Sequence, residues 1–227
     1  MANLEKTYQY AGGRAVTQNR VVRNTYWLLS LSMIPTVLGA AAGMTLGVPI
    51  PGGFLGALLF LGIAFGFIWA IEKNKDSGLG VALLLGFTFF MGLMLAPLLS
   101  RTLTFANGGT LIMLAFGGTA TIFAVLASIA TVSKRDFSGV AKFAMIGLVI
   151  IILASLANIF FAIPALTLTI SVLAIGIFSA FILYDVQRIV NGGETNYISA
   201  TLGLYLSVYN IFSSLLSILG FTSGSRE

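Results

Sequence analysis

The sequence predicts an all-α, polytopic membrane protein built from about seven transmembrane helices. Hydrophobic residues make up 58% of the 227 residues and charged residues only 8%, whereas about a quarter of a soluble domain is charged. The hydrophobic segments repeatedly approach the length of about 20 residues that spans a bilayer, and only short polar connections separate them. A chain of this composition cannot cover itself with polar surface, so we expect lipid to surround it.

Seven hydrophobic segments define the predicted helices, with boundaries good to a few residues. No connection between them is long enough for a soluble domain. We therefore expect one membrane domain over residues 24–222, with a polar amino-terminal tail over 1–23 and a short carboxyl-terminal tail over 223–227. The predicted spans are 25–47, 54–71, 80–98, 110–132, 143–161, 165–189 and 197–221.

The amino-terminal tail carries basic side chains but no apolar core followed by a cleavage site. It does not resemble a removable signal peptide, so we expect the first span to remain as an anchor. The tail is polar and rich in Gly, Gln, Asn and Thr. For this composition we predict disorder.

Lys and Arg predict the orientation, because basic residues beside a span are retained on the cytoplasmic side during insertion. With the amino terminus inside, ten of the twelve basic residues are cytoplasmic, and only Arg101 and Arg226 lie outside. The net charge of +5 thus indicates topology rather than nucleic acid binding. An odd number of spans then places the carboxyl terminus outside. The ten residues are Lys6, Arg14, Arg20, Arg23, Lys73, Lys75, Lys134, Arg135, Lys142 and Arg188.

Cysteine and histidine are both absent. Their absence removes disulfides, thiolate nucleophiles, imidazole bases and the usual zinc ligands. A single carboxylate well inside the spans does not provide the paired acids of an aspartyl site, so no complete catalytic constellation is visible. We expect no enzyme activity, no cofactor and no metal site.

Glycines recur at helix-packing spacing in the first two spans. Gly39, Gly43 and Gly47 lie in the first, and Gly62 and Gly66 in the second. Such spacing lets helix backbones approach closely, which is how helices associate in lipid. We expect packing within the bundle, with dimerisation or a binding groove as the alternative.

Asp185 is the one acidic side chain well inside a hydrophobic span. A carboxylate near mid-bilayer costs at least a few kcal/mol, so it is expected to face the bundle interior or water and to be paired or protonated. Arg188 follows one turn later and would be a partner. The alternative is that Asp185 lies near the cytoplasmic end of its helix, with Arg188 reaching the lipid headgroups.

The seventh span carries a stripe of small and polar residues. Gly203, Ser207, Asn210, Ser214 and Ser217 recur at intervals of three or four and share one helical face. We expect this face to turn inward, where hydroxyl and amide groups bond to other helices or to water. The stripe then either serves packing alone or lines a polar cavity together with the aspartate of the sixth span.

Gly192 and Gly193 interrupt the pattern between the last two spans. They are expected to end the sixth helix and permit a tight return. Glu194, directly after them, would then lie near the cytoplasmic mouth of any cavity.

From Tyr184 onward the chain reads YDVQRIVNGGETNYISATLGLYLSVYNIFSSLLSILG, which resembles the carboxyl-terminal signature of the Bax inhibitor-1 family. The GGETNYI run and the YNIFSSLLSILGF ending are most similar to the YccA branch of that family. VVRNTYWLLSLS at the start of the first span and GGTA at 117–120 extend the likeness over nearly the whole chain.

The resemblance implies a seven-helix bundle in which the last helix is central, placed in the bacterial inner membrane. The outside carboxyl terminus predicted from the charge count would then be periplasmic. For the YccA branch it further implies a protein that binds the membrane-embedded FtsH protease and restrains its attack on other membrane proteins. A cytoplasmic amino-terminal tail suits that role, because a processive protease starts on such segments. Our first hypothesis is therefore a non-enzymatic modulator of FtsH.

The family also implies a pH-sensitive calcium leak, attributed to a pair of acidic residues on the last two helices. Asp185 matches the first of these, whereas Ser207 stands where many members have the second. Two nearby carboxylates can share a proton, whereas a single carboxylate cannot. A lone Asp also binds calcium poorly, because calcium prefers several oxygen ligands. The second hypothesis is a calcium or proton leak gated through Asp185, with Arg188, Ser207 and Asn210 beside it.

Overall fold

The computed structural model describes residues 2–47 and 52–224, and in this part of the chain every regular element is an α-helix. Each of the seven helices is long and apolar enough to cross a membrane, and in α1 this stretch begins at Gln18. The predicted all-α, seven-helix class is confirmed. The helices are α1 (Ala2–Leu46), α2 (Gly53–Lys73), α3 (Gly78–Leu103), α4 (Gly108–Val132), α5 (Ser138–Phe161), α6 (Pro164–Val190) and α7 (Tyr197–Gly224).

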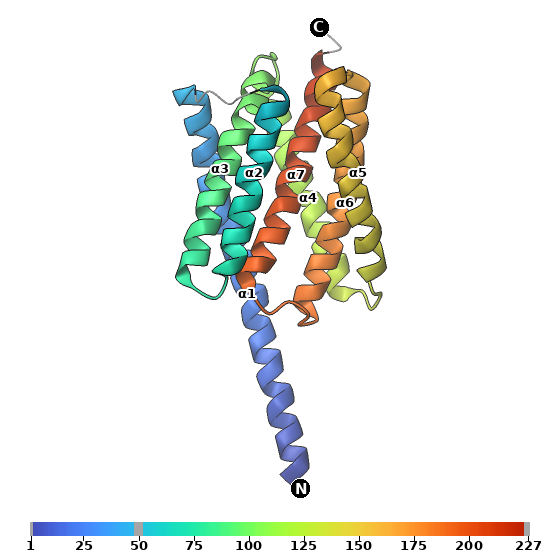
Figure 1. Ribbon diagram of the computed structural model, residues 1–227. Coiled ribbons are helices and arrows are strands. Elements are labelled where there is room, and N and C mark those ends of the chain that lie inside the picture. Colours follow the sequence, from blue (N-terminus) through green and yellow to red (C-terminus); the bar gives the residue numbers. More distant parts are fainter. Residues whose placement is uncertain (1, 48–51, 225–227) are drawn as a thin grey trace.

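The amino-terminal segment differs from the prediction. Instead of a disordered tail, the membrane-spanning part of α1 continues as helix back to Ala2. Figure 1 shows this segment projecting well beyond the bundle. Residues 2–23 contain no proline and many good helix formers, such as Ala, Arg and Gln. Because the membrane span supplies a preformed helix, extension needs no new nucleus.

The two ends of the bundle differ in charge. We call the end where α1 projects the amino-terminal end, which also holds the loops at 74–77, 133–137 and 191–196, while 104–107 and the end of α7 lie opposite (Figure 1). Basic residues gather at the amino-terminal end, and Arg101 lies near the other. Those at the amino-terminal end are Arg20, Arg23, Lys73, Lys75, Lys134, Arg135, Lys142 and Arg188.

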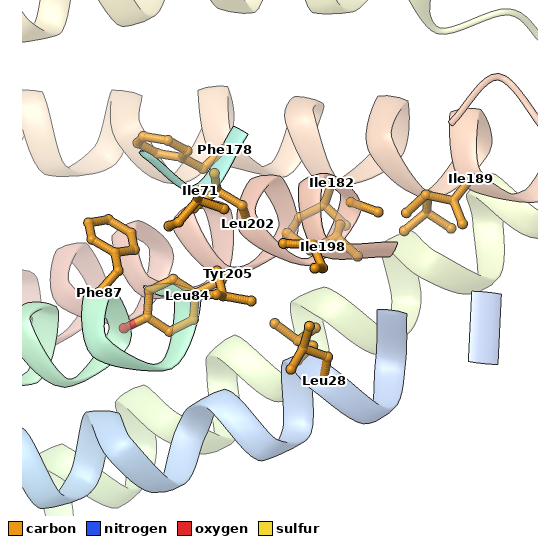
Figure 2. Packing of buried hydrophobic residues seen from close by; sticks show 14 of the residues in the cluster. Leu28, Ile71, Leu84, Phe87, Phe178, Ile182, Ile189, Ile198, Leu202 and Tyr205 are labelled. Atoms are coloured by element: carbon orange, nitrogen blue, oxygen red, sulfur yellow. The ribbon is translucent and has the colours of Figure 1, made fainter. Parts of the chain in front are cut away.

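Helix α7 is the centre of the bundle, as expected. It contacts α1, α2, α3, α4 and α6, while α5 packs against α6 and α2 at the edge. Tyr205 and Leu204 of α7 are fully buried. Figure 2 shows buried side chains of α7 lying among those of α1, α3 and α6. The labelled ones include Ile198, Leu202 and Tyr205 of α7, Leu28 of α1, Leu84 and Phe87 of α3, and Phe178 and Ile182 of α6.

Glycines bring α1 and α3 into close contact. A β-carbon on Gly39 would collide with the backbone of α3, and one on Gly92 would collide with the backbone of α1. A β-carbon on Gly43 would lie 2.6 Å from that of Ala96 and 3.2 Å from the carbonyl oxygen of Leu93. That carbonyl precedes Pro97 by four residues, so proline leaves it without its usual helical donor. The predicted packing role of Gly39 and Gly43 is confirmed.

The other three glycines do not pack. Gly47 has a φ of 58° just after α1, where the left-handed conformation favours glycine. Nothing lies within 4 Å of a β-carbon built on Gly47, Gly62 or Gly66, and all three are exposed. The prediction of bundle packing is wrong for these positions, because α2 meets its neighbours through a different face.

The tight return between α6 and α7 is confirmed. Gly192 adopts a φ of 74°, and the backbone N–H of Gly193 donates to the carbonyl of Arg188 at 2.8 Å, as in a glycine-terminated helix. Asn196 caps α7, because its Oδ1 accepts from the N–H of Ile198 at 2.9 Å. Its Nδ2 also donates to the carbonyl of Lys75 at 3.0 Å, which ties this loop to the α2–α3 loop.

Candidate functional site

Asp185 lies between the last two helices. It is half-buried on α6, which ends at Val190, so the residue is about 8 Å from the helix end at 1.5 Å per residue. Its carboxylate faces α7, where a β-carbon on Gly203 would lie 3.0 Å from Oδ2. The absence of a side chain at Gly203 leaves the space that the carboxylate occupies. Asp185 therefore faces inward, as in the first interpretation of the sequence, and also lies near a helix end, as in the alternative.

No hydrogen bond or ion pair engages the Asp185 carboxylate within residues 2–47 and 52–224. The charged groups whose fields reach it are Arg188 and Glu194, of opposite sign. A lone carboxylate in this setting can take up or release one proton. It offers few of the oxygen ligands that calcium prefers.

Arg188 does not pair with Asp185. Its Nη2 lies 2.9 Å from Oε2 of Glu194, and its Nε donates to the carbonyl of Gly193 at 3.3 Å. The expected Asp185–Arg188 pair is thus wrong, because the turn at Gly192 folds Glu194 back over the end of α6. Glu194 also accepts from the N–H of Asn196 at 3.0 Å, so this ion pair stabilises the loop.

The small polar stripe of α7 turns inward, as predicted. Ser207 is only 2% exposed and Ser214 is buried, while Gly203, Asn210 and Ser217 are half-buried. In the described part of the chain, none of these side chains hydrogen-bonds to another helix. The Nδ2 of Asn210 donates instead to the carbonyl of Leu206 in its own helix at 2.8 Å. The stripe therefore keeps unused hydrogen-bonding capacity inside the bundle.

The structure brings the four predicted site residues together only in part. Asp185 contacts α7 at Gly203, one turn before Ser207. Asn210 lies about 10 Å farther along α7 than Gly203, from the helical rise. Arg188 lies in the last turn of α6 and pairs with Glu194 of the following loop instead. The arrangement is therefore the small polar stripe of α7, with the carboxylate of Asp185 at the end of the stripe nearest Gly203.

Sequence reasoning missed a second polar face of α7, which carries Thr201, Tyr205 and Tyr209. Their spacing of four residues places them on one face and could have revealed it. Tyrosines in an apolar span are more readily interpreted as packing residues than as hydrogen-bond donors, so the face was not predicted. The two tyrosines bond to α1 and α3: Tyr205 OH lies 2.9 Å from Thr36 Oγ1 and 3.4 Å from Thr88 O, and Tyr209 OH donates to Met91 O at 3.1 Å. Thr201 Oγ1 lies 3.3 Å from Thr25 O of α1 but is closer, at 2.7 Å, to Tyr197 O of its own helix.

In the described part of the chain, seven apolar helices with α7 at their centre, and an acidic residue of α6 facing a glycine of α7, define a polytopic helical membrane protein. The chain belongs to the Bax inhibitor-1 family: residues 18–224 match the family model described as Inhibitor of apoptosis-promoting Bax1. The matched region begins where the membrane-spanning part of α1 begins and ends with α7.

Relatives within this family cover nearly the whole chain. "Modulator of FtsH protease YccA" of Escherichia coli K12 is 40% identical over 208 residues, which are 92% of this chain and 93% of the relative. "Inner membrane protein YccA" of Escherichia coli O6:H1 matches equally well. An "Uncharacterized membrane protein" of Vibrio cholerae is 41% identical over 91% of this chain and 92% of its own length. The similarity to the YccA branch is thereby confirmed, and these names describe a modulator and membrane proteins rather than enzymes.

Proposed function

We propose that the protein is a non-enzymatic modulator of the FtsH protease in the bacterial inner membrane. The observation that carries this proposal is the similarity, along 92% of this chain, to a relative named as a modulator of that protease. A chain without Cys or His, acting by helix contacts rather than by chemistry, is consistent with such a role.

The proposed orientation places the amino-terminal end of the bundle in the cytoplasm. It is supported by the basic residues gathered at that end. The carboxyl terminus then lies in the periplasm, at the opposite end of the seventh helix.

The projecting part of α1 is the proposed contact for the protease. Residues 2–17 precede the membrane span and, as helix, reach about 24 Å from the bundle. A helical backbone over these residues favours docking over the presentation of an unfolded end.

Co-isolation of FtsH from membranes tests this contact. The full chain is compared with a variant in which a Gly/Ser sequence of equal length replaces residues 2–17, so that length is kept and helix is lost. We expect the variant to insert normally, because the membrane spans are intact, and to recover at least about tenfold less FtsH. Equal recovery from both chains would remove the arm from the proposal.

A second candidate function is a calcium or proton leak gated through Asp185. It is favoured by one specific observation: the carboxylate lies between α6 and α7, at one end of the polar stripe, and makes no hydrogen bond to any residue that the structure describes. Ser207 in place of a second acid weakens it, because one carboxylate cannot share a proton with another.

Flux measurements in proteoliposomes separate the two functions. If the leak operates, Asp185→Asn abolishes calcium or proton flux between pH 5 and 8, while Glu194→Gln, which changes a charge in the loop, retains most of it. Ser207→Asp would then strengthen the pH dependence, because it adds a second carboxylate one turn along α7 from the Gly203 position that Asp185 faces. Wild-type flux no greater than that of empty liposomes would reject this candidate.

A further inference from the structure

A polar pocket lies at the amino-terminal end of the bundle, and neither Asp185 nor the stripe of α7 lines it. It has a volume of about 450 Å³ and opens between the α4–α5 loop at 133–137 and the end of α6. Lys134, Arg135 and Asp136 line it from the loop, and Gln187 and Asn191 line it from the end of α6.

The loop wall of this pocket is held in place by a buried amide. Gln187 is only 7% exposed. Its Oε1 accepts from the N–H of Phe137 at 2.9 Å, and its Nε2 donates to the carbonyl of Arg135. One side chain of α6 thus fixes the backbone on both sides of Asp136, and a fixed site loses less entropy when a ligand binds.

The two basic side chains of the pocket have no partner among the described residues. Lys134 and Arg135 are exposed, and within the described ranges neither side chain makes a hydrogen bond or an ion pair. Elsewhere at this end, Lys75 lies 3.2 Å from Glu72 and Arg188 pairs with Glu194. The charges of Lys134 and Arg135 therefore remain available to an anion.

Asp136 contributes a negative charge but is turned toward the start of α5. Its Oδ1 accepts from the N–H of Ser138 at 2.9 Å. Hydrogen bonds from Ser138, with a smaller contribution from Lys142, lower the pKa of Asp136 below its usual value. Two cations against one engaged carboxylate leave the pocket with a net positive charge.

The pocket lies at the level where the apolar helix surface gives way to polar loop. The membrane-spanning part of α4 ends at Val132, which lines the pocket and is 82% exposed, and Lys134 follows two residues later. Headgroup phosphates of a bilayer lie at this depth, and basic pockets between helix ends are sites for anionic headgroups. An acyl chain leaving the pocket would run along Val132.

We propose that this pocket binds the phosphate group of an anionic membrane lipid. Lys134 and Arg135 contact the phosphate, and the amide of Asn191 lies on the opposite wall as a donor for the headgroup. This site is independent of the proposed action on FtsH and of Asp185.

The test uses the purified full chain in an uncharged detergent and follows its thermal unfolding midpoint. The probes are a short-chain phosphatidylglycerol, the matching phosphatidylcholine, and glycerol 3-phosphate. The variant K134Q/R135Q removes both charges of the pocket. K73Q/K75Q is the matched control, because it removes two charges at the same end of the bundle but outside the pocket.

We expect phosphatidylglycerol to raise the unfolding midpoint of the parent chain and of the control chain. The K134Q/R135Q chain should need at least about tenfold more phosphatidylglycerol for the same rise in midpoint. The single variants K134Q and R135Q are expected to lose part of this affinity each. Equal losses in both double variants would overturn the proposal, since the effect would then be general charge. An equal effect of phosphatidylcholine would also overturn it. An equal effect of glycerol 3-phosphate at the same concentration would show that the pocket binds a soluble anion, and would overturn the proposal of a lipid ligand.

Discussion

The face of α7 that meets α1 and α3 is fixed by hydrogen bonds from Tyr205 and Tyr209. By contrast, the face that carries Ser207 and Asn210 makes no side-chain hydrogen bond to another helix in the part of the chain that the structure describes. Both faces are polar and both are turned inward. The two faces therefore differ in how their polar groups are used.

The difference shows which polar groups serve the fold. In lipid, hydrogen bonds between helices and close glycine contacts hold a bundle together, because burial from water no longer drives association. The side of α7 toward α1 and α3 has the hydrogen bonds, and Gly39 and Gly92 bring α1 and α3 themselves into close contact. The stripe on the other side, with Asp185 at its end, keeps polar groups that the fold does not need.

Gly39→Ala should produce the largest loss of stability, because it disrupts the α1–α3 contact on which the hydrogen-bonded side rests. The added β-carbon would collide with the backbone of α3, and backbone cannot move as a flexible side chain can. We expect a loss of about 3 kcal/mol, measured by denaturant titration in detergent. Gly62→Ala is the control, and because its β-carbon would meet open space, stability should change by less than about 1 kcal/mol.

Tyr205→Phe should have an intermediate effect. The variant keeps the buried ring but removes the hydroxyl that contacts Thr36 and Thr88. A loss of about 1 kcal/mol is expected in the same titration. Tyr197→Phe, at the start of the same helix, serves as the control and should leave the unfolding midpoint unchanged.

Ser207→Ala should have the smallest effect. The serine is buried but bonds to no other helix in the described residues, so its loss should change stability by less than about 0.5 kcal/mol. A loss equal to that of Tyr205→Phe in the same titration would break the comparison, because the stripe would then serve the fold as much as the tyrosines do.

The sequence predicts the helices well because each span is a long apolar segment with short polar breaks. It also predicts the inward turn of the Ser207 stripe, because the helical period determines which residues share a face. The return at Gly192 also follows from local chemistry, as glycine adopts the positive φ that the turn requires.

Partners distant in sequence or set by loop geometry are harder to predict. Arg188 is one turn from Asp185, yet the turn brings Glu194 closer to its guanidinium. The hydroxyl partners of Tyr205 lie on α1 and α3, far away in the chain. Gly62 has the same spacing from Gly66 as Gly39 from Gly43, and only the arrangement of the bundle separates open glycines from packed ones.

The most direct test of the proposed function is the degradation of a membrane substrate by FtsH in vesicles that contain the purified protein. Three chains are compared: the full chain, the chain in which Gly/Ser replaces residues 2–17, and Asp185→Asn. The account predicts that the full chain and Asp185→Asn slow degradation equally, whereas the Gly/Ser chain does not slow it. Degradation unaffected by the full chain would contradict the account, as would a loss of the effect in Asp185→Asn alone.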